Sequence, residues 1–577
     1  MEYKKRKFLS IELFFLVLLA IYPLRHIHMG VDLWDAGYNY ANFRYNGLEH
    51  MDSMWYFATW LANGIGSLFT CLPFGDTCLG MNIYTSLVVS LMAATAFLFC
   101  VRKLKMPAWL VFLAEMLAIS LCWLPTAVLY TYLTYAFLLA ALILLYQGVL
   151  KEQNGYLIGA GIVLGLNVAV RFSNLAQMAL ILIVWSYGII AKKKFSRVLQ
   201  ETGCCVLGYV GALAAFLGVM AARYGLNHYI EGVWRLFGMT EHAEDYAPGY
   251  MVLSMLKTYY KNTYFLKRYA VVYAVALAAC VLLPKKWSAV KKIISILASF
   301  FLMVWLVRIH FFVRDFAMYD AIFYPCVTVL TITLCLSVYQ LVDKNVSKED
   351  KLLGIILILV ILLTCLGSNN AIHANINNMF LVLPGFFGQV WRFCREKTHI
   401  YFYPVKCALL LSGLILVVQG VQFGVGFVYE EARGGRDFSA VIEEVPILEG
   451  MRTNPEKAKA IEGLYQYLQE NRLGDRECIL YGEIPAVAYF AELAPALNIW
   501  SDLPSYDYEV MVQELQKVEG RPIIILSAEC GQYVIDRDAS GLFREETAHQ
   551  KMELLCSYIE EEGYQTTFSN TEFVLYE

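Results

Sequence analysis

The chain has 577 residues, of which 59% are hydrophobic and only 16% are charged, and its mean hydropathy is +0.52. Soluble proteins carry about 25% charged residues, so this composition excludes a soluble globular protein and predicts a polytopic α-helical membrane protein. Residues 430–577 hold 29 of the 49 acidic residues but 12 of the 46 basic ones. This asymmetry predicts two parts in different solvents, and it excludes nucleic acid as a partner because that partner requires a basic surface.

The N-terminus begins a membrane span. Four basic residues (Lys4–Lys7) precede an apolar segment with no small-residue cleavage site, so we interpret it as a retained transmembrane helix and not as a signal peptide. Spans need about 17–25 apolar residues. On this basis the chain has thirteen candidate spans, at 8–28, 82–101, 107–124, 130–149, 155–172, 175–191, 203–222, 268–284, 293–308, 321–342, 352–367, 379–391 and 404–428.

The distribution of basic residues between the spans predicts the orientation in the cell membrane. With a cytoplasmic N-terminus, the short inner segments hold 22 Lys and Arg residues and the longer outer segments hold 11. Thirteen spans then place the C-terminus outside the cytoplasm. The long or polar outer segments are 29–81, 223–267 and 368–378, so any chemistry is expected at the outer face.

Beyond residue 430 the pattern is that of a water-exposed α/β domain. Helical periodicity at 458–471 precedes two short apolar strands, 478–484 and 522–528, with a helical segment at 509–518 between them. This order is βαβ-like, and 571–577 is expected to add one more strand. We therefore predict a transmembrane domain at 1–429 and an extracytoplasmic α/β domain at 430–577. A G-x-G-x-x-G motif is absent, so no dinucleotide site is implied.

The segment MGVDLWDAGYNYANFRY, residues 29–45, places Asp32 and Asp35 at the membrane boundary directly after the first span. Acidic residues are costly there unless they have partners or a function. Two alternatives stay open for each: a catalytic carboxylate, or a cap for a short helix that begins near Ala36. Tyr38 and the aromatic residues that follow it are either a sugar-stacking face or interfacial aromatics.

Within this segment W-D-A-G-Y (34–38) resembles the pattern of acid, small residue and tyrosine that follows the first helix of the GT-C superfamily. These are polyprenyl-phosphate-dependent glycosyltransferases, and they include the protein O-mannosyltransferase and lipid A aminoarabinose transferase families. Their commonest bacterial form has two adjacent acids; here Trp34 occupies the first place and the second acid is Asp32.

The resemblance implies a GT-C-like fold, a polyprenyl-phosphate-sugar donor and inverting transfer to a glycan, lipid or protein. Such a reaction needs a base for the acceptor proton. Asp35 is the expected base, and Asp32 is the second candidate catalytic residue.

Basic residues on the outer side are the candidates for binding the donor phosphate. Arg308 and Arg314 flank His310, and Arg171 ends the fifth span. The guanidinium fork can bind two phosphate oxygens at once. Snorkelling to the lipid headgroups is the alternative function.

Further substrate contacts are predicted at Tyr38, at Glu231 in the second outer loop, and at Asn369 and Asn370 in the amide-rich loop 367–378. Glu241–Asp245 gather possible metal ligands, but their spacing matches no strong zinc motif. No cofactor is therefore predicted, and a divalent metal is left open.

The sequence thus favours a membrane glycosyltransferase with a C-terminal α/β domain. One alternative is a polysaccharide polymerase or ligase, which favours a large outer loop late in the membrane domain. The other is a lipid-glycan transporter or flippase, for which broken helices in paired halves are expected. A transferase should place Asp35 at a cavity that opens to the outer leaflet, whereas a transporter should have a cavity at the midplane.

Overall fold

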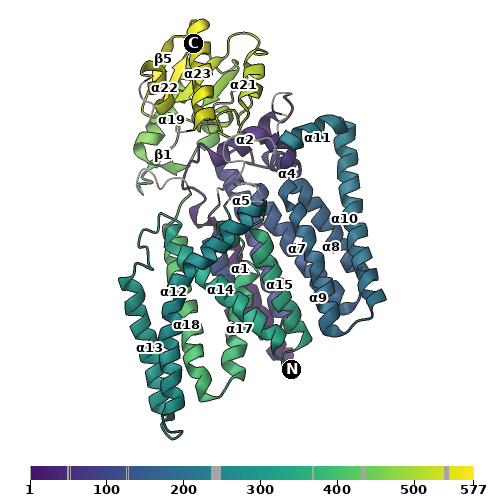
Figure 1. Cartoon of the computed structure of the whole chain (residues 1–577). Helices are drawn as coiled ribbons and strands as arrows, with labels where there is room; N and C mark the ends of the chain where they lie inside the picture. Colours follow the sequence, from purple (N-terminus) through teal and green to yellow (C-terminus); the bar gives the residue numbers. More distant parts are fainter. Residues whose placement is uncertain are drawn as a thin grey trace.

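The computed structural model describes residues 2–577 except 49–50, 52–53, 125, 128, 236–247, 367–369, 430–436, 538–542 and 544. The chain forms a long bundle of helices with an α/β unit at one end, and the N-terminus lies at the opposite end of the bundle (Figure 1). The division into a membrane domain at 1–429 and an extracytoplasmic domain at 430–577 stays a prediction.

Within the described residues, eight helical segments are long and apolar enough to cross a membrane, and two further apolar helices are shorter. A multi-pass α-helical membrane protein is therefore confirmed. The eight are α5 (Cys78–Arg102), η3 with α9 (Phe172–Ile181 and Leu182–Ala191), α7 (Tyr130–Lys151), α10 (Phe195–Arg223), α12 (Pro248–Leu282), α13 (Ser288–Arg308), α14 (Asp320–Val342) and η6 with α18 (Ile400–Phe402 and Tyr403–Gly426); the two shorter ones are α6 (Ala108–Leu121) and α8 (Asn154–Val170).

Three more helices complete the bundle: α1 (Glu2–Ile21), α15 (Lys348–Thr364) and α17 (Val382–Glu396). Each of the thirteen predicted segments overlaps one of these helices. The number of helices that cross the bilayer stays a prediction, as does the cytoplasmic position of the N-terminus.

Local sequence signals explain several helix boundaries. The Thr77 hydroxyl accepts a hydrogen bond from the backbone N–H of Gly80 and so caps α5 at 3.1 Å. Ser347 caps α15 in the same way. At the end of α7, Glu152 adopts the left-handed conformation that commonly terminates a helix.

Close packing of α8 on α10 depends on small residues. A Cβ atom on Gly208 would lie 2.1 Å from the backbone carbonyl oxygen of Ile158, so only glycine fits there. Small residues let helix backbones approach in membranes, where the hydrophobic effect does not drive helices together. The pair α8–α10 thus forms one rigid edge of the bundle.

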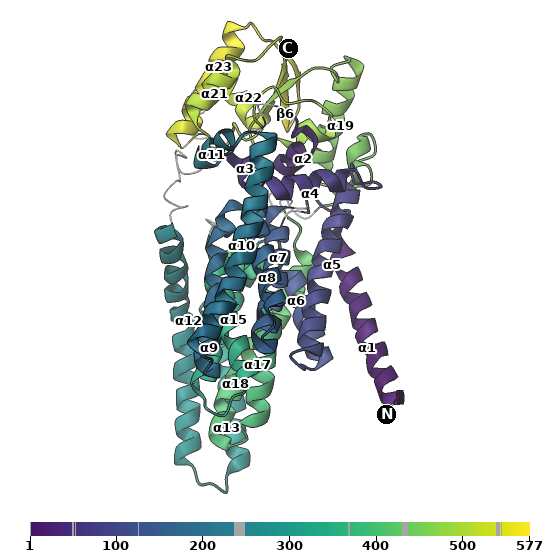
Figure 2. The ribbon, with the colours of Figure 1, turned by 90° about the vertical axis from the view of Figure 1, so that its right-hand side faces the viewer.

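Short helices lie between the bundle and the α/β unit (Figure 2). They are α2 (Asp35–Tyr45), α3 (Met54–Ala58), α4 (Trp60–Thr70) and α11 (Leu226–Trp234). At the end of α1, the 3-10 helix η1 (Tyr22–His26) leads into the acidic segment. The ends of the bundle that face the α/β unit are therefore covered by irregular chain and short helices.

The α/β unit has the predicted βαβ order. Strands β3 (Cys478–Tyr481) and β4 (Ile523–Ser527) pair in parallel, and β6 (Phe573–Tyr576) pairs antiparallel with β4 and with β5 (Thr566–Ser569). The sheet order is β3-β4-β6-β5. The other elements of the α/β unit are β1 (Ala440–Val441), η8 (Pro446–Leu448), β2 (Arg452–Thr453), α19 (Pro455–Glu470), α20 (Ala486–Phe490), α21 (Tyr508–Leu515), α22 (Ala528–Ile535) and α23 (Glu546–Glu561). One short helix, α16 (Ile372–Asn377), belongs to the bundle.

The α/β unit packs tightly on α2 through α20. A Cβ on Gly37 would lie 2.4 Å from the backbone nitrogen of Ala486, so the two backbones are in direct contact. Nearby, the rings of Tyr40 and Tyr489 stack with centroids 4.7 Å apart. One apolar core runs from the bundle through α2 into this face of the α/β unit.

We predict that residues 437–577 fold when they are expressed alone, because the far side of the sheet has its own core, which includes Ile524 and Met552. The face of α20 is covered by α2 in the whole chain, so the fragment should also self-associate. Circular dichroism on heating and size-exclusion chromatography measure these two properties.

The variant Tyr489→Ser removes a ring from the contact face and leaves the far core intact, so it should reduce self-association and keep cooperative unfolding. A fragment without a cooperative transition would show that the α/β unit depends on α2 to fold.

Candidate active site

The two acidic residues of the segment 29–45 have different local roles. The backbone N–H of Trp34 donates to one Asp32 carboxylate oxygen at 3.0 Å, and that of Ala36 donates to the other at 2.7 Å. Asp32 therefore acts as a cap for the first turn of α2, where free N–H groups and the helix dipole favour a negative charge.

Asp35 is the first residue of α2, and its carboxylate accepts a hydrogen bond from the hydroxyl of Tyr429. Tyr429 follows α18, so this bond joins the two ends of the membrane domain. Burial raises the pKa of the Asp35 carboxyl above its ordinary value, and the hydrogen bond from Tyr429 opposes the shift. A raised pKa brings a carboxylate closer to the range in which it is effective as a general base.

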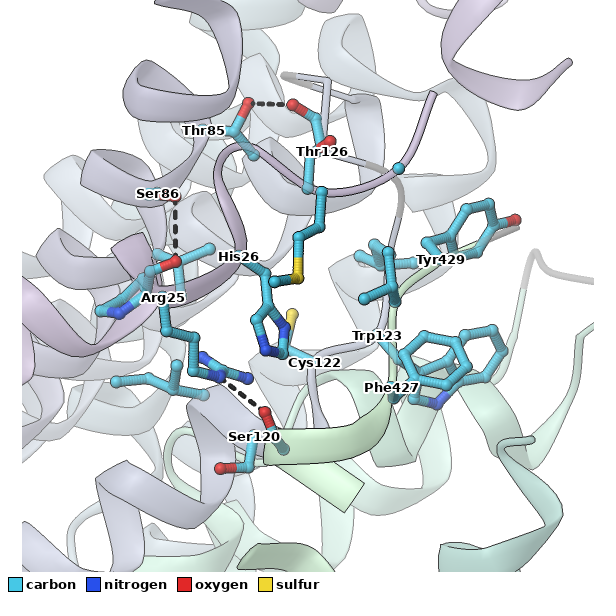
Figure 3. A pocket seen from close by; sticks show the side chains of 18 of the residues that line it. Arg25, His26, Thr85, Ser86, Ser120, Cys122, Trp123, Thr126, Phe427 and Tyr429 are labelled. Carbon is cyan, nitrogen blue, oxygen red and sulfur yellow. Dashed lines mark hydrogen bonds between the residues drawn. The ribbon is translucent and has the colours of Figure 1, made fainter. Parts of the chain in front are cut away.

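A cavity of about 100 Å³ with both polar and apolar lining residues lies beside this acidic segment, at the end of the bundle that faces the α/β unit. Figure 3 shows that Arg25 and His26 form part of its wall, with Tyr429 among the other lining residues. Asp32 also lines the cavity, whereas Asp35 is not among its lining residues and is hydrogen-bonded to one of them, Tyr429. The remaining polar lining comes mainly from Thr85, Ser86, Ser120 and Thr126.

Arg25 is the cation of this cavity. Its Nε donates to the backbone carbonyl of Gly424 at 2.7 Å, and one terminal nitrogen donates to that of Tyr22 at 3.3 Å. Within the part of the chain that the structure describes, Arg25 forms no ion pair with a carboxylate. Carbonyl groups therefore hold the guanidinium in place, without an ion pair to any carboxylate of the described residues.

Sequence reasoning missed Arg25, His26 and Tyr429. A signal for the first two was present: they lie at the outer end of the first span, where the predicted topology has few cations. Tyr429 carried no signal, because it reaches Asp35 across 394 positions of the sequence.

The arginines predicted from the sequence lie elsewhere. Arg308 ends α13 and is exposed, and the exposed Arg314 and His310 follow it. The guanidinium of Arg171 lies over the ring of Tyr130, 4.8 Å from its centroid. The structure thus does not bring these four residues to the cavity that Asp32 and Tyr429 line.

The other predicted contacts are also separate from that cavity. Tyr38 is buried, and its ring stacks on Trp500 of the α/β unit with centroids 3.9 Å apart. Glu231 is exposed on α11, and Asn370 is exposed before α16. Asn369 lies outside the described residues.

The described residues contain no group of three or more His, Cys, Asp or Glu side chains that is arranged to hold a metal ion. The segment Glu241–Asp245, where the sequence left a metal open, lies outside the described residues.

The buried Asp35 carboxyl should make stability depend on pH. Its pKa is higher in the folded state than in the unfolded chain. Its contribution to stability is therefore fully present below the unfolded pKa and is lost as the pH rises through the folded pKa. The melting temperature of the wild type, relative to Asp35→Asn, should fall as the pH rises above about 4, the ordinary pKa of an Asp carboxyl. Thermal unfolding in detergent measures it, and a constant difference as the pH rises would contradict this effect.

Comparison with known proteins gives a remote structural likeness. No protein-family model and no curated protein matches the chain. Among solved structures, it is similar to ArnT from Cupriavidus metallidurans bound to undecaprenyl phosphate, at 11% identity over 99% of this chain and 98% of that one, with a TM-score of 0.35. The same ArnT in the apo state gives 10% identity over the same shares and a TM-score of 0.40.

A third similar structure is the arabinosyltransferase EmbB from Mycobacterium smegmatis. It is 12% identical over 72% of this chain and 41% of that one, with a TM-score of 0.34.

Proposed function

We propose that the protein is a membrane glycosyltransferase that moves a monosaccharide from a polyprenyl-phosphate donor to an acceptor outside the cytoplasm. The observation that carries the proposal is the Asp35–Tyr429 hydrogen bond at the wall of a cavity that also contains Arg25. Asp35, Tyr429 and Arg25 together supply a base, a hydroxyl and a cation at this site. The TM-scores of the similar structures lie below 0.5, so the proposal rests on residues of this chain.

The position of the cavity favours a transferase over a transporter. Much of its lining comes from helix ends and the chain that follows them, namely η1 after α1, the end of α6 and the residues after it, and the end of α18 and the residues after it; α5 adds Thr85, Ser86 and Val89. All of these ends lie toward the α/β unit. A transporter would be expected to hold its substrate near the bilayer midplane.

Glycosyl transfer requires the acceptor hydroxyl to lose a proton as it attacks the sugar carbon. Asp35 is the proposed base. The proposed proton path runs through Tyr429, which lines the cavity and donates its hydroxyl to Asp35: the acceptor proton passes to the tyrosine oxygen while the tyrosine proton passes to Asp35. The bond from the sugar carbon to the donor phosphate breaks as the new glycosidic bond forms.

The departing lipid phosphate requires a positive charge. Arg25 is the proposed partner because it lines the cavity and its guanidinium has no acidic partner within the described residues. Preorganised charge of this kind contributes strongly to catalysis, since no solvent has to reorganise during the reaction. Arg308 and Arg314, the arginines predicted first, remain the alternative phosphate site.

Asp35→Asn should lower turnover by about 10²–10⁴-fold, the usual contribution of a positioned base. Protein level and donor binding should stay near the wild type, because asparagine keeps the shape of the side chain. The measurement is transfer by purified protein from a panel of labelled undecaprenyl-phosphate sugars. Tyr429→Phe should give a loss of similar size, because it interrupts the same proton path.

Asp32→Asn is the matched control. The two Asp32 oxygens already accept backbone N–H groups, so this substitution should lower turnover less than Asp35→Asn does. A larger loss in Asp32→Asn than in Asp35→Asn would exchange their roles. Near-normal transfer by the double variant would exclude the mechanism.

Arg25→Gln should raise the KM for the lipid donor or lower kcat, because it removes the charge opposite the departing phosphate. Arg308→Ala and Arg314→Ala are matched controls, since both side chains are exposed and lie away from the cavity. Steady-state kinetics with varied donor measure the effect. A donor effect confined to the two controls would move the phosphate site to the loop that follows α13.

A further inference from the structure

The turn that carries Asp32 and Asp35 is called the acidic turn below. The α/β unit contacts it through one continuous chain of side-chain hydrogen bonds. The indole N–H of Trp34 donates to the Tyr38 hydroxyl at 3.2 Å, and that hydroxyl donates to Asp502 at 2.5 Å. The other Asp502 oxygen accepts the backbone N–H of Glu483 at 2.7 Å. Trp34 directly precedes Asp35, so this chain ends at the residue next to the candidate base.

The backbone of the same turn is also held from the α/β unit. The backbone N–H of Ala486 donates to the Leu33 carbonyl at 3.0 Å, and the Lys457 ammonium donates to the Val31 carbonyl at 2.6 Å. Just before it, the N–H of Gly30 donates to the carbonyl of Arg452 at 2.9 Å. Three separate elements of the α/β unit thus fix residues 30–33.

The Tyr38 contact is more specific than general adhesion between two domains. Its ring is nearly parallel to that of Trp500, at 6°, so stacking and the hydrogen bond fix both its plane and its direction. Charged acceptors form the stronger hydrogen bonds, and Asp502 is such an acceptor. By contrast, the hydroxyl of Tyr45 donates to the Ala488 carbonyl at 3.0 Å across the same interface but bonds to nothing in the acidic turn.

We propose that Asp502 is a positioning residue that acts through Tyr38 and Trp34 on the turn carrying Asp32 and Asp35, so that the α/β domain completes the active site of the membrane domain. This inference rests on the proposed function for its catalytic meaning. Its structural content, a turn held in place from the α/β domain, stands independently.

The physical reason is positional precision. A base acts only when it lies within hydrogen-bond reach of the proton it removes, and a displacement of about 1 Å lowers the rate by about 10²-fold. Asp35 begins a helix of only eleven residues, which does not hold its own first turn rigidly. Contacts from a separate folded unit supply that rigidity.

Hydrogen exchange of the full-length protein in detergent tests the structural content. Tyr38→Phe removes the hydroxyl and keeps the stacking on Trp500, and Asp502→Asn keeps the shape and removes the charge. Both should speed exchange of the amides of Trp34 and Ala36, by about tenfold for Tyr38→Phe, the change expected for one lost hydrogen bond to a charged group.

Tyr45→Phe is the matched control, because it removes one hydroxyl from the same helix and the same interface. It should leave those two amides unchanged. Equal acceleration in both tyrosine variants would indicate general loosening of the interface, and no acceleration in Tyr38→Phe would show that the turn is held without Asp502. Either result overturns the proposal.

Transfer kinetics separate this inference from the proposed function. With the same panel of labelled undecaprenyl-phosphate sugars, Tyr38→Phe should lower kcat by about 10-fold to 100-fold at unchanged donor KM, and Tyr45→Phe should change neither. If the exchange result holds but the wild type transfers no sugar, the positioning is correct and the proposed function is wrong. If the wild type is active and Tyr38→Phe keeps its full kcat, the catalytic role of Asp502 is excluded.

Discussion

The structure that follows α1 depends on how two carboxylates are accommodated where the helix bundle meets the α/β unit. An acid in a partly buried site is costly unless donors satisfy it, and the segment itself supplies donors for only one of the two. Asp32 takes the backbone N–H groups of Trp34 and Ala36, which are left over at the start of α2. Asp35 takes its donor from Tyr429, beyond the last helix of the bundle. The beginning and the end of the membrane domain are therefore joined at this point.

The same constraint explains why the α/β domain packs so closely on α2. Tyr38 is buried and polar, so its hydroxyl needs partners, and Asp502 and Trp34 provide them. Gly37 allows α20 to approach until backbone meets backbone. A larger side chain at this position would separate the two domains and leave buried polar groups without partners. The close packing of α2 on α20 and the hydrogen bonding of the buried polar groups thus require the same arrangement.

Local pattern was enough to predict the long helices of the bundle and the main strands of the α/β unit, because apolar length and periodicity determine them, but it did not predict short helices such as α4, α11 and α20. The strands 478–484 and 522–528 coincide with β3 and β4, and the helix expected between them is α21. The arrangement of the candidate site was harder to predict from the sequence. Asp32 and Asp35 were visible as acids at a membrane boundary, but their partners come from tertiary contacts. Nothing in the residues around Tyr429 or Asp502 indicates that either one meets the segment 29–45.

Arg25 shows a second reason why the sequence was insufficient. Arginines outside the membrane were ranked by their neighbours, which favoured Arg308 and Arg314 around His310. What distinguishes Arg25 is the shape of the chain around it: η1 turns the side chain into the cavity, where carbonyl groups of Tyr22 and Gly424 hold it. An exposed arginine has water and lipid headgroups as competing partners, whereas an arginine held by carbonyl groups keeps its charge available for an anion.

The geometry also bears on the choice between a capping and a catalytic role for the acids, which the sequence left open. A carboxylate whose two oxygens both accept backbone N–H groups at 3.0 Å or less is fixed in position by the turn it caps. That describes Asp32, which nevertheless lines the cavity and contributes its charge there. Asp35 has a raised pKa and accepts a hydrogen bond from Tyr429, a residue that lines the cavity. Under the proposed mechanism the two carboxylates have different roles: Asp32 fixes the turn, and Asp35 accepts the proton.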